Sequence, residues 1–431
     1  MNALLPYVIE LERHLNTQHL SEEQWKAWCD SCLDGTPSRE LRRVAQLADL
    51  KEQGAFFTGP RLARQAAVTL GPSTEDESVY CDPTCGVGDL LLAVARRLSL
   101  APTVSETLSL WGSSLTGCDL SPVFVRAAKA RLALLAMRRC GLRESIAPAA
   151  LDDLLPAITV CDALRCHDRY SAVDRIIMNP PFRMMPAPED CEWSAGRLNA
   201  AALFTESAIV HSRDGTRIAA ILPDVLRSGS RYERWRRMVG GNTVVEEVRP
   251  YGPFDRHADV DVFVLRMTVK SNGNVETHRA WSRNDGDSDD AVSKYFGVRV
   301  GPVVPHRDAE EGPECPYVHA RSLPPWSTLA NIAETRRFAG TVFRPPFVAV
   351  RRTSGPRDRK RAVGTIVLGK QCVAVENHVI VCIPAEGSVA RCQALLERLR
   401  SSRTDDWLNR RIRCRHLTTA AVSGIPWWND P

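Results

Sequence analysis

Long hydrophobic segments are missing from this sequence. No apolar run in its 431 residues approaches the roughly 20 residues that a membrane-spanning helix needs. The opening residues MNALLPYVIELERH become acidic too early for a secretory signal peptide. The 14 cysteines are scattered instead of being spaced as a disulfide framework, so we expect reduced thiols. These absences predict a soluble, cytoplasmic protein without a membrane partner.

Motifs for metal binding and for nucleotide hydrolysis are also lacking. Cys29 and Cys32 form the one CxxC pair. Without a second pair or a histidine cluster they predict no zinc site, and nothing else suggests a catalytic metal. The sequence contains no P-loop of the form GxxxxGK(S/T) and no convincing nuclease motif, so cleavage or translocation would need partner proteins. It also shows no repeat of fixed period.

The composition is that of a globular protein, and its charge is unevenly distributed. Hydrophobic residues make up 44% of the chain and charged residues 25%, and the length suits two or three domains. Residues 301–431 hold 20 Lys and Arg against 12 Asp and Glu, whereas the remaining residues hold 36 against 39. The basic surplus therefore lies in the C-terminal third, which points mildly to a polyanionic partner there.

Apolar spacing divides the chain into segments of different character. Residues 1–50 have helical spacing. Residues 51–270 form the expected catalytic domain. In it GAFFTGPRLARQAAVTL reads as a Gly-Pro loop leading into a helix, and residues 79–270 alternate strands and helices, which predicts an α/β fold with a parallel sheet and helices on both faces. A polar, Gly- and Asn-rich stretch predicts a linker region within 271–300, and residues 301–431 predict a second, α+β domain. The expected strands are VYCDPTCG, LTGCDLS, AITVCDA, DRIIMNPPF, TRIAAILPD, DVFVLRMTV, FVAVRR, GTIVL and HVIVCI, and the expected helices after residue 80 are DLLLAVARRL, PVFVRAAKARLALLAMRR, ALFTESAIVHSR and RCQALLERLR.

A glycine-rich loop joins the first of these strands to a helix, in the sequence Asp82-Pro-Thr-Cys-Gly-Val-Gly-Asp89. Glycines let the backbone turn tightly and approach a ligand in front of the helix N-terminus. Asp119 and Asp162 end the next two strands, and in an open α/β sheet such strand ends line one crevice. A carboxylate there can bind ribose hydroxyls or an adenine amino group. Taken singly, each Asp also fits a helix cap.

Asn179, Pro180, Pro181 and Phe182 follow a further strand and carry the sharpest chemical signal. The side-chain carbonyl of Asn179 and the backbone carbonyl of Pro180 can both accept hydrogen bonds from one exocyclic NH2 group. Two acceptors that hold both hydrogens favour a pyramidal nitrogen, so its lone pair becomes available for attack. Phe182 offers a face on which a planar ring can stack. The structural alternative is a rigid proline turn with a buried Phe.

In these motifs the sequence resembles the S-adenosylmethionine-dependent amino-methyltransferases that act on DNA. DPTCGVGDLL looks like their motif I, IMNPPF like motif IV, and FFTGP like the motif X loop that closes over the cofactor. AAILP resembles the region after motif IV, and YGPFDRHADVDVFVL resembles motif VIII. Motif X precedes motif I and the additional domain is C-terminal. This order is similar to the gamma class of type I modification subunits and type II N6-adenine enzymes.

The resemblance implies a Rossmann-like methyltransferase sheet, S-adenosylmethionine as cofactor, and a role for each matching residue. Asp82 and its loop would border the methionine part of the cofactor, Asp119 would hold the ribose, and Asp162 would accept from the adenine amino group. Phe254 would be a second aromatic contact of the target base, or simply a core residue. The implied cofactor residues are Phe57, Thr58, Asp82, Pro83, Thr84, Gly86, Gly88, Asp119, Leu120 and Asp162, and the implied catalytic residues are Asn179, Pro180, Pro181 and Phe182.

The densest basic patch lies in the C-terminal third and is opposed only by Asp358. It looks like a phosphate-contacting loop of a recognition domain, or it is a solvated loop. The same two interpretations apply to a second cluster at 410–416. Glu376-Asn377-His378 either contacts base edges or forms a structural turn. The first patch comprises Arg344, Arg351, Arg352, Arg357, Arg359, Lys360 and Arg361.

We therefore expect a site-specific DNA methyltransferase that acts on the N6 amine of a flipped-out adenine in double-stranded DNA, with restriction or defence-system subunits as candidate partners. NPPF in this motif order implies adenine more than cytosine. One alternative is the same chemistry on RNA or protein, because NPPF and NPPY loops occur there too. The other is a non-catalytic DNA-binding subunit of a defence complex, against which the intact Asn179 and acidic strand ends speak.

Overall fold

The computed structural model divides the chain into two compact units. The first consists of Met1–Arg227 and Tyr232–Ser282, and the second of Ser228–Arg231 and Arg283–Pro431. The second unit is therefore not continuous in sequence. The linker expected at 271–300 lies mostly outside the residues that the structure describes, which are 4–16, 20–44, 57–71, 78–255, 260–270, 281, 290–354, 358–414 and 416–428. No helix in these ranges combines the length and apolar character that a membrane span requires.

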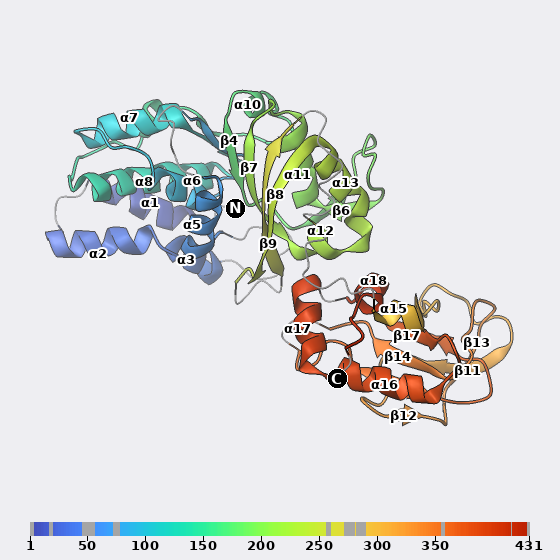
Figure 1. Cartoon of the computed structure of the whole chain (residues 1–431). Helices are drawn as coiled ribbons and strands as arrows, with labels where there is room; N and C mark the ends of the chain where they lie inside the picture. The colour runs from blue at the N-terminus through green and yellow to red at the C-terminus, as the bar shows by residue number, and fades with distance from the viewer. Residues whose placement is uncertain are drawn as a thin grey trace. The chain divides into compact units, whose positions relative to one another are not determined.

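The first unit is built on a seven-stranded sheet (Figure 1). From one edge to the other its strands are β3 (Ile158–Val160), β2 (Leu115–Asp119), β1 (Tyr80–Asp82), β4 (Arg175–Met178), β7 (Arg217–Pro223), β9 (Asp261–Val269) and β8 (Thr243–Pro253). The strands from β3 to β7 are parallel, whereas β9 runs antiparallel to both of its neighbours. The structure confirms the expected α/β class, and it confirms the six strands expected in this region.

Side chains of the central strands enter two hydrophobic cores, one on each face of the sheet. Ile177 of β4 packs into one core, and its neighbours Ile176 and Met178 pack into the other. All three are fully buried, as expected for a parallel strand that is covered on both faces. The helices of this unit after the N-terminal segment are α5 (Pro60–Thr69), α6 (Asp89–Ala95), α7 (Val104–Ser114), α8 (Pro122–Cys140) and α9 (Ala150–Leu154), and then α10 (Asp168–Ser171), α11 (Ala200–Val210), α12 (Asp224–Ser228) and α13 (Glu233–Asn242). The short helix η2 (Ser230–Tyr232) is divided between the two units.

The sequence patterns missed the helices α9, α10, α12 and α13 of the first unit and, in addition, three further features. One is α7, and another is the two-stranded hairpin of β5 (Met184–Pro186) and β6 (Arg197–Asn199). The third is β8, the long edge strand, whose pairing with β9 shifts register between Val245 and Glu247 and again between Pro250 and Gly252. These irregularities and the Pro and Gly inside the strand interrupt the alternation by which a half-buried strand is recognised. A short connection from β8 to β9 also explains the antiparallel edge.

The N-terminal helices form part of the first unit instead of a unit of their own. They are α1 (Leu5–His14), α2 (Glu22–Cys32) and α3 (Thr36–Val44). Leu11 and Trp25 share the hydrophobic core that contains α6 and α8. Ser21 begins α2 with a capping box, in which its hydroxyl accepts from the Gln24 N–H and the Gln24 side chain accepts from the Ser21 N–H. This local signal stops the chain from continuing α1 into α2.

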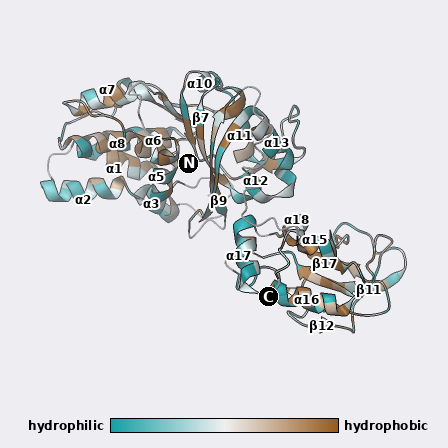
Figure 2. Ribbon diagram, viewed as in Figure 1, coloured by the Kyte–Doolittle hydropathy of each residue, from teal (hydrophilic) through white to brown (hydrophobic). Residues whose placement is uncertain are grey.

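The second unit has the expected α+β character. Its main sheet has five strands in the order β10 (Phe296–Val300), β17 (Val379–Pro384), β14 (Phe347–Arg351), β15 (Gly364–Val367) and β12 (Thr328–Leu329). A smaller sheet holds β13 (Thr335–Arg337), β11 (Glu314–Val318) and β16 (Ala374–Val375), and the helices are α15 (Val292–Tyr295), α16 (Val389–Arg400), α17 (Ser402–Arg411) and α18 (Thr419–Ser423). Figure 2 shows hydrophobic colouring on β17 and hydrophilic colouring along α17.

Candidate active site

A cavity of about 520 Å³ lies where β1, β2, β3 and β4 end. This carboxyl edge is where open α/β sheets bind ligands. Most of the residues expected to act together meet in it although they come from distant parts of the sequence. The expected residues that line the cavity are Phe57, Thr58, Asp82, Pro83, Thr84, Gly86, Asp119, Leu120, Asp162, Asn179 and Pro181, whereas Gly88, Pro180, Phe182 and Phe254 lie outside this lining.

The glycine-rich loop bends tightly into the cavity at the start of α6. Gly86 has a φ of 50° and its N–H donates to Oδ2 of Asp119 at 3.1 Å. Gly88 has a φ of 86° and caps α6, and a Cβ atom there would lie 3.0 Å from Cβ of Ala128 on α8. Both the backbone conformation and the close approach of α8 therefore require glycine at position 88. Gly88 shapes the loop from behind, which is why it does not line the cavity.

Asp82 is the most deeply buried of the three expected carboxylates, at 1% exposure. Its Oδ1 accepts a hydrogen bond from the Thr84 N–H at 3.1 Å. Burial raises the pKa of Asp82 from its ordinary value of 3.8 to about 8, against the opposing effect of that hydrogen bond. The side chain is therefore poised to hold a proton near neutral pH, and a cation placed beside it would favour the ionised form.

We expect Asp82 to make the first unit less stable as the pH rises. The pKa of Asp82 is higher in the folded than in the unfolded protein, so protonation of this side chain stabilises the fold. The contribution is complete below about pH 4 and is lost as the pH approaches 8, and over this range the free energy of unfolding falls by at most about 1.4 kcal/mol per pH unit. Asp82→Asn should flatten this dependence. Urea unfolding of the wild type and the variant at pH 5 and pH 8 measures it, and an equal loss of stability in both proteins would contradict the prediction.

Asp119 and Asp162 use their carboxylates to hold the backbone around the cavity. Asp119 accepts from the Ser121 N–H at 2.8 Å through Oδ1, in addition to the contact with the glycine loop. Burial raises the pKa of Asp119, although these hydrogen bonds oppose the rise. Asp162 is more open, with 38% of its side chain exposed, and its Oδ1 accepts from the Leu164 N–H at 3.0 Å. Neither Asp is a helix N-cap, since Ser121 occupies that position before α8 and His167 occupies it before α10.

The Asn179–Phe182 loop borders the same cavity from β4. Nδ2 of Asn179 donates to Oγ1 of Thr58 at 2.8 Å, so the loop and the segment before α5 meet directly. The rings of Phe182 and Phe254 pack edge to face, with centroids 5.6 Å apart and planes at 83°. Phe254 is 8% exposed and belongs to the core. The structure thus places Phe254 beside the loop, where it supports the ring of Phe182.

Several lining residues were not singled out by the sequence patterns. Phe124 of α8 packs against Phe57 with ring centroids 5.2 Å apart, which places one aromatic residue behind another at the cavity wall. Arg183 and Met185 reach the cavity because the β5–β6 hairpin folds back after Phe182. The sequence around Arg183 and Met185 does not indicate that a hairpin returns the chain to the cavity. The other unforeseen lining residues include Asp89, Cys161, Ala163, Leu164 and Phe204.

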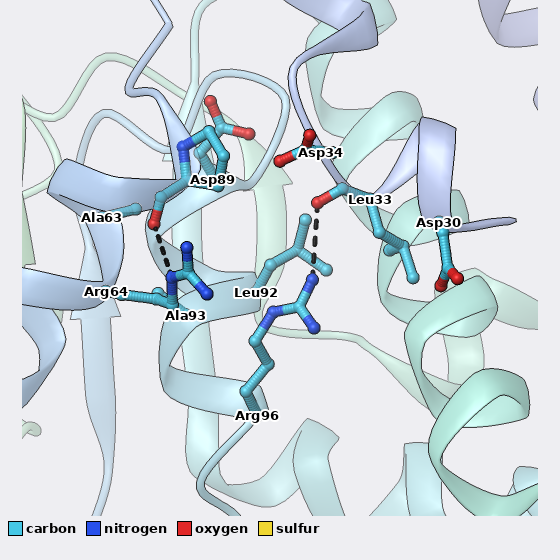
Figure 3. Close-up of a pocket in the computed structure, with 10 residues that line it drawn as sticks. Asp30, Leu33, Asp34, Ala63, Arg64, Asp89, Leu92, Ala93 and Arg96 are labelled. Carbon is cyan, nitrogen blue, oxygen red and sulfur yellow. Dashed lines mark hydrogen bonds between the residues drawn. The ribbon is translucent and has the colours of Figure 1, made fainter.

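A second, smaller cavity of about 220 Å³ lies between α2, α5 and α6, and Asp89 lines both cavities (Figure 3). Two arginines face it, and both donate to backbone carbonyls. Arg96 Nη2 donates to the Leu33 carbonyl at 3.4 Å, and Arg64 Nε donates to the Pro60 carbonyl at 3.2 Å. The Arg96 contact joins the end of α6 to the end of α2, whereas Arg64 and Pro60 both belong to α5. The second cavity is therefore a seam between helices.

Arg131 of α8 joins that seam to the glycine-rich loop. It is 1% exposed and contacts Asp89 Oδ1 at 2.8 Å. Its Nη1 also donates to the Val87 carbonyl at 2.6 Å, and its Nε donates to the Cys32 carbonyl at the end of α2 at 2.9 Å. One buried side chain therefore connects an N-terminal helix with the loop that borders the main cavity.

The structure contradicts the expectation that Arg361 contacts phosphate. Arg361 is 1% exposed. Its guanidinium donates to Oδ1 of Asn409 at 2.7 Å and to the carbonyls of Ile412 at 3.0 Å and Cys414 at 3.2 Å. Enclosed in this way, the side chain holds the end of α17 against the segment before β15 and reaches no external ligand.

Other members of the basic patch are divided between internal contacts and solvent. Arg351 and Arg352 donate to backbone carbonyls within the second unit, and Lys360 contacts Asp405 at 2.9 Å. Arg344 and Arg359 are exposed. Arg357 lies outside the described residues. In the turn at 376–378 the Glu376 carboxylate accepts from the Ala320 N–H at 3.2 Å, which gives this turn a structural role.

Searches against protein-family models and curated proteins return no match. Among solved structures, a modification subunit of a putative type I restriction enzyme from Vibrio vulnificus is 19% identical with a TM-score of 0.42, covering 59% of this chain and 51% of that chain. The type I restriction enzyme EcoKI M protein is 16% identical with a TM-score of 0.38, covering 63% of each chain. The type IIL restriction-modification enzyme MmeI in complex with DNA is 13% identical with a TM-score of 0.49, covering 87% of this chain and 64% of that chain. This chain thus spans between about half and two thirds of their lengths.

Proposed function

We propose that this chain is a site-specific DNA methyltransferase that uses S-adenosylmethionine to methylate the N6 amine of a flipped-out adenine. We further propose that it works in a restriction-modification or phage-defence system. One observation carries the proposal. The acidic strand ends and the Asn179 loop, which suit a nucleoside cofactor and an aromatic amine respectively, line a single cavity. A donor and an acceptor of a methyl group have to meet within such a space.

The residues around the cavity fit S-adenosylmethionine by their chemistry. Each carboxylate oxygen of Asp119 accepts one hydrogen bond from a backbone N–H group. Because a carboxylate oxygen has two lone pairs, Asp119 can still accept hydrogen bonds from ribose hydroxyls. The half-exposed Asp162 can accept from an adenine amino group, with Leu120 as apolar neighbour. Asp82 would lie near the cationic methionine end. The volume of about 520 Å³ is in the range of small-molecule sites. Bound there, the cofactor would supply an electrophilic methyl group.

The Asn179 loop would hold the adenine amine and make it reactive. The Asn179 side-chain carbonyl and the Pro180 carbonyl would each accept one N–H, which favours the pyramidal nitrogen that attacks. Phe182, backed by Phe254 at 5.6 Å, would stack on the extruded base. Extrusion costs a few kcal/mol of pairing and stacking, and stacking on an aromatic side chain returns about 1 to 3 kcal/mol. The exposed Arg344 and Arg359 are the members of the basic patch that we propose for phosphate contact.

Methylation-sensitive long-read sequencing tests this function. The chain is expressed in a host that lacks DNA methylation, and its genomic DNA is sequenced. We expect N6-methyladenine at one short recurring motif, and none in cells that carry Asn179→Ala. N4-methylcytosine would correct the base. No modified base, together with methyl transfer from tritiated S-adenosylmethionine to RNA or protein in the lysate, would overturn the proposal in favour of another amine.

A further inference from the structure

The Asn179–Phe182 loop has few means to hold its own shape. Pro180 and Pro181 have no backbone N–H, so half of the loop cannot donate the hydrogen bonds that usually fix a turn. Its prolines stiffen the backbone but do not attach it to the rest of the protein. A loop whose carbonyls must meet the two hydrogens of one amine needs placement within about 0.5 Å. Contacts from outside the loop have to provide it.

Thr58 contacts the beginning of the loop. This side chain is 5% exposed, and its Oγ1 accepts from Nδ2 of Asn179 at 2.8 Å. In the structure the nitrogen end of the Asn179 amide is directed at Thr58, so the carbonyl end points the other way. Thr58 was expected to close over the cofactor. Its contact with Asn179 gives it an additional task.

Asn199 contacts the end of the loop. It lies at the end of β6, is 6% exposed, and its Nδ2 donates to the Phe182 carbonyl at 2.9 Å. Two further hydrogen bonds fix the position of Asn199. It is the N-cap of α11, so its Oδ1 accepts from the Ala201 N–H at 3.0 Å, and its backbone N–H donates to the Tyr232 hydroxyl at 2.9 Å. The β5–β6 hairpin leads the chain away from the loop and returns it at this residue.

We propose that Thr58 and Asn199 are positioning residues that hold the two ends of the Asn179–Phe182 loop for methyl transfer. Thr58 sets the direction of the Asn179 amide. Asn199 holds the Phe182 carbonyl, and thereby sets the position of the Phe182 ring and of the Pro180 carbonyl. The proposal rests on the function proposed above. Neither residue needs to touch the amine, so both act through the loop.

Thr58→Val removes the acceptor and keeps the shape of the side chain. We expect kcat for tritium transfer to methylation-free genomic DNA to fall about tenfold, as for one lost orienting hydrogen bond. KM for DNA and the calorimetric Kd for S-adenosylmethionine should stay within about twofold. Thr58→Ser restores the hydroxyl and should recover most of the rate, and Thr328→Val, exposed in the second unit, is the matched control. An unchanged kcat, or a Kd that rises in proportion, would overturn the role of Thr58.

Asn199→Ser separates the loop contact from the helix cap. Ser caps a helix about as well as Asn and is neutral, but its short side chain has no amide to donate to the Phe182 carbonyl. We expect kcat to fall tenfold or more with a small change in melting temperature, while Asn199→Ala, which also loses the cap, should lower the melting temperature further. Trypsin provides a readout without DNA, because the exposed Arg183 directly follows the loop. Cleavage after Arg183 should be several-fold faster in Asn199→Ser. If the wild type transfers no methyl group to DNA, the proposed function fails, and unchanged cleavage separately overturns the role of Asn199.

Discussion

Asn179→Ala is expected to lower methyl transfer to DNA by about 10²- to 10³-fold, the loss typical for one preorganised polar group at a reacting centre. The variant removes the acceptor proposed for the adenine amine, and it removes the donor to Thr58. Its free energy of unfolding should fall by no more than about 1 to 3 kcal/mol, the usual cost of leaving a buried polar group such as the Thr58 hydroxyl without its partner. Single-turnover tritium transfer gives the rate, and urea unfolding gives the stability.

The matched control for this variant is Asn242→Ala. Asn242 is an exposed residue at the end of α13, where its side chain donates to the Met238 carbonyl. It should transfer methyl groups at the wild-type rate. Full activity in Asn179→Ala, with Asn242→Ala also active, would contradict the proposed mechanism. An equal loss of methyl-transfer rate in both variants would show that Asn179→Ala acts through stability, and that Asn179 has no specific role in the reaction.

Arg131→Met should destabilise the first unit by about 3 to 5 kcal/mol, the usual cost of leaving one partner of a buried ion pair uncompensated. Asp89 would lose its charged partner at 2.8 Å, and the carbonyls of Val87 and Cys32 would lose their donor. Burial already raises the pKa of Asp89 against the effect of Arg131, so the defect should grow as the pH rises and the carboxylate ionises. Urea unfolding at pH 5 and pH 8 measures both effects.

Two further variants test the cause of the stability loss expected in Arg131→Met. Arg126→Met breaks an exposed ion pair with Glu12 and should cost at most about 1 kcal/mol. Asp89→Asn in the Arg131→Met background removes the uncompensated charge and should restore part of the stability, most clearly at pH 8. If Arg131→Met costs no more than Arg126→Met, then Arg131 does not couple the N-terminal helices to the glycine loop.

The sequence predicts those parts of the structure that depend on residues close together along the chain. Strand β4 and the loop at Asn179 are recognisable because a short apolar run is followed at once by a fixed group of four residues. The acidic ends of β2 and β3 are recognisable in the same way. In contrast, β8 is long but interrupted at Pro250 and Gly252 and is half exposed, so its pattern is weak. Arg183 and Met185 depend on a hairpin that folds back.

Arg361 shows a second limit of prediction from sequence. It lies among exposed basic residues such as Arg359, and nothing in the local sequence distinguishes the two. The difference arises from α17, about 45 residues later, whose C-terminal carbonyls and Asn409 enclose the Arg361 guanidinium. A charge count measures only composition. Burial depends on which distant segment covers the side chain, and a single sequence does not contain that information in readable form.

The two prolines of the Asn179–Phe182 loop also determine how ligand binding can be observed. Hydrogen–deuterium exchange follows backbone amides, and Pro180 and Pro181 have none, so this loop contributes signals only from Asn179 and Phe182. Occupancy of the site is better followed at the two anchors outside the loop. The Asn199 amide already donates to the Tyr232 hydroxyl, and its exchange rate should slow further when a bound base tightens the loop. The peptides that contain Thr58 and Asn199 are therefore the reporters to monitor.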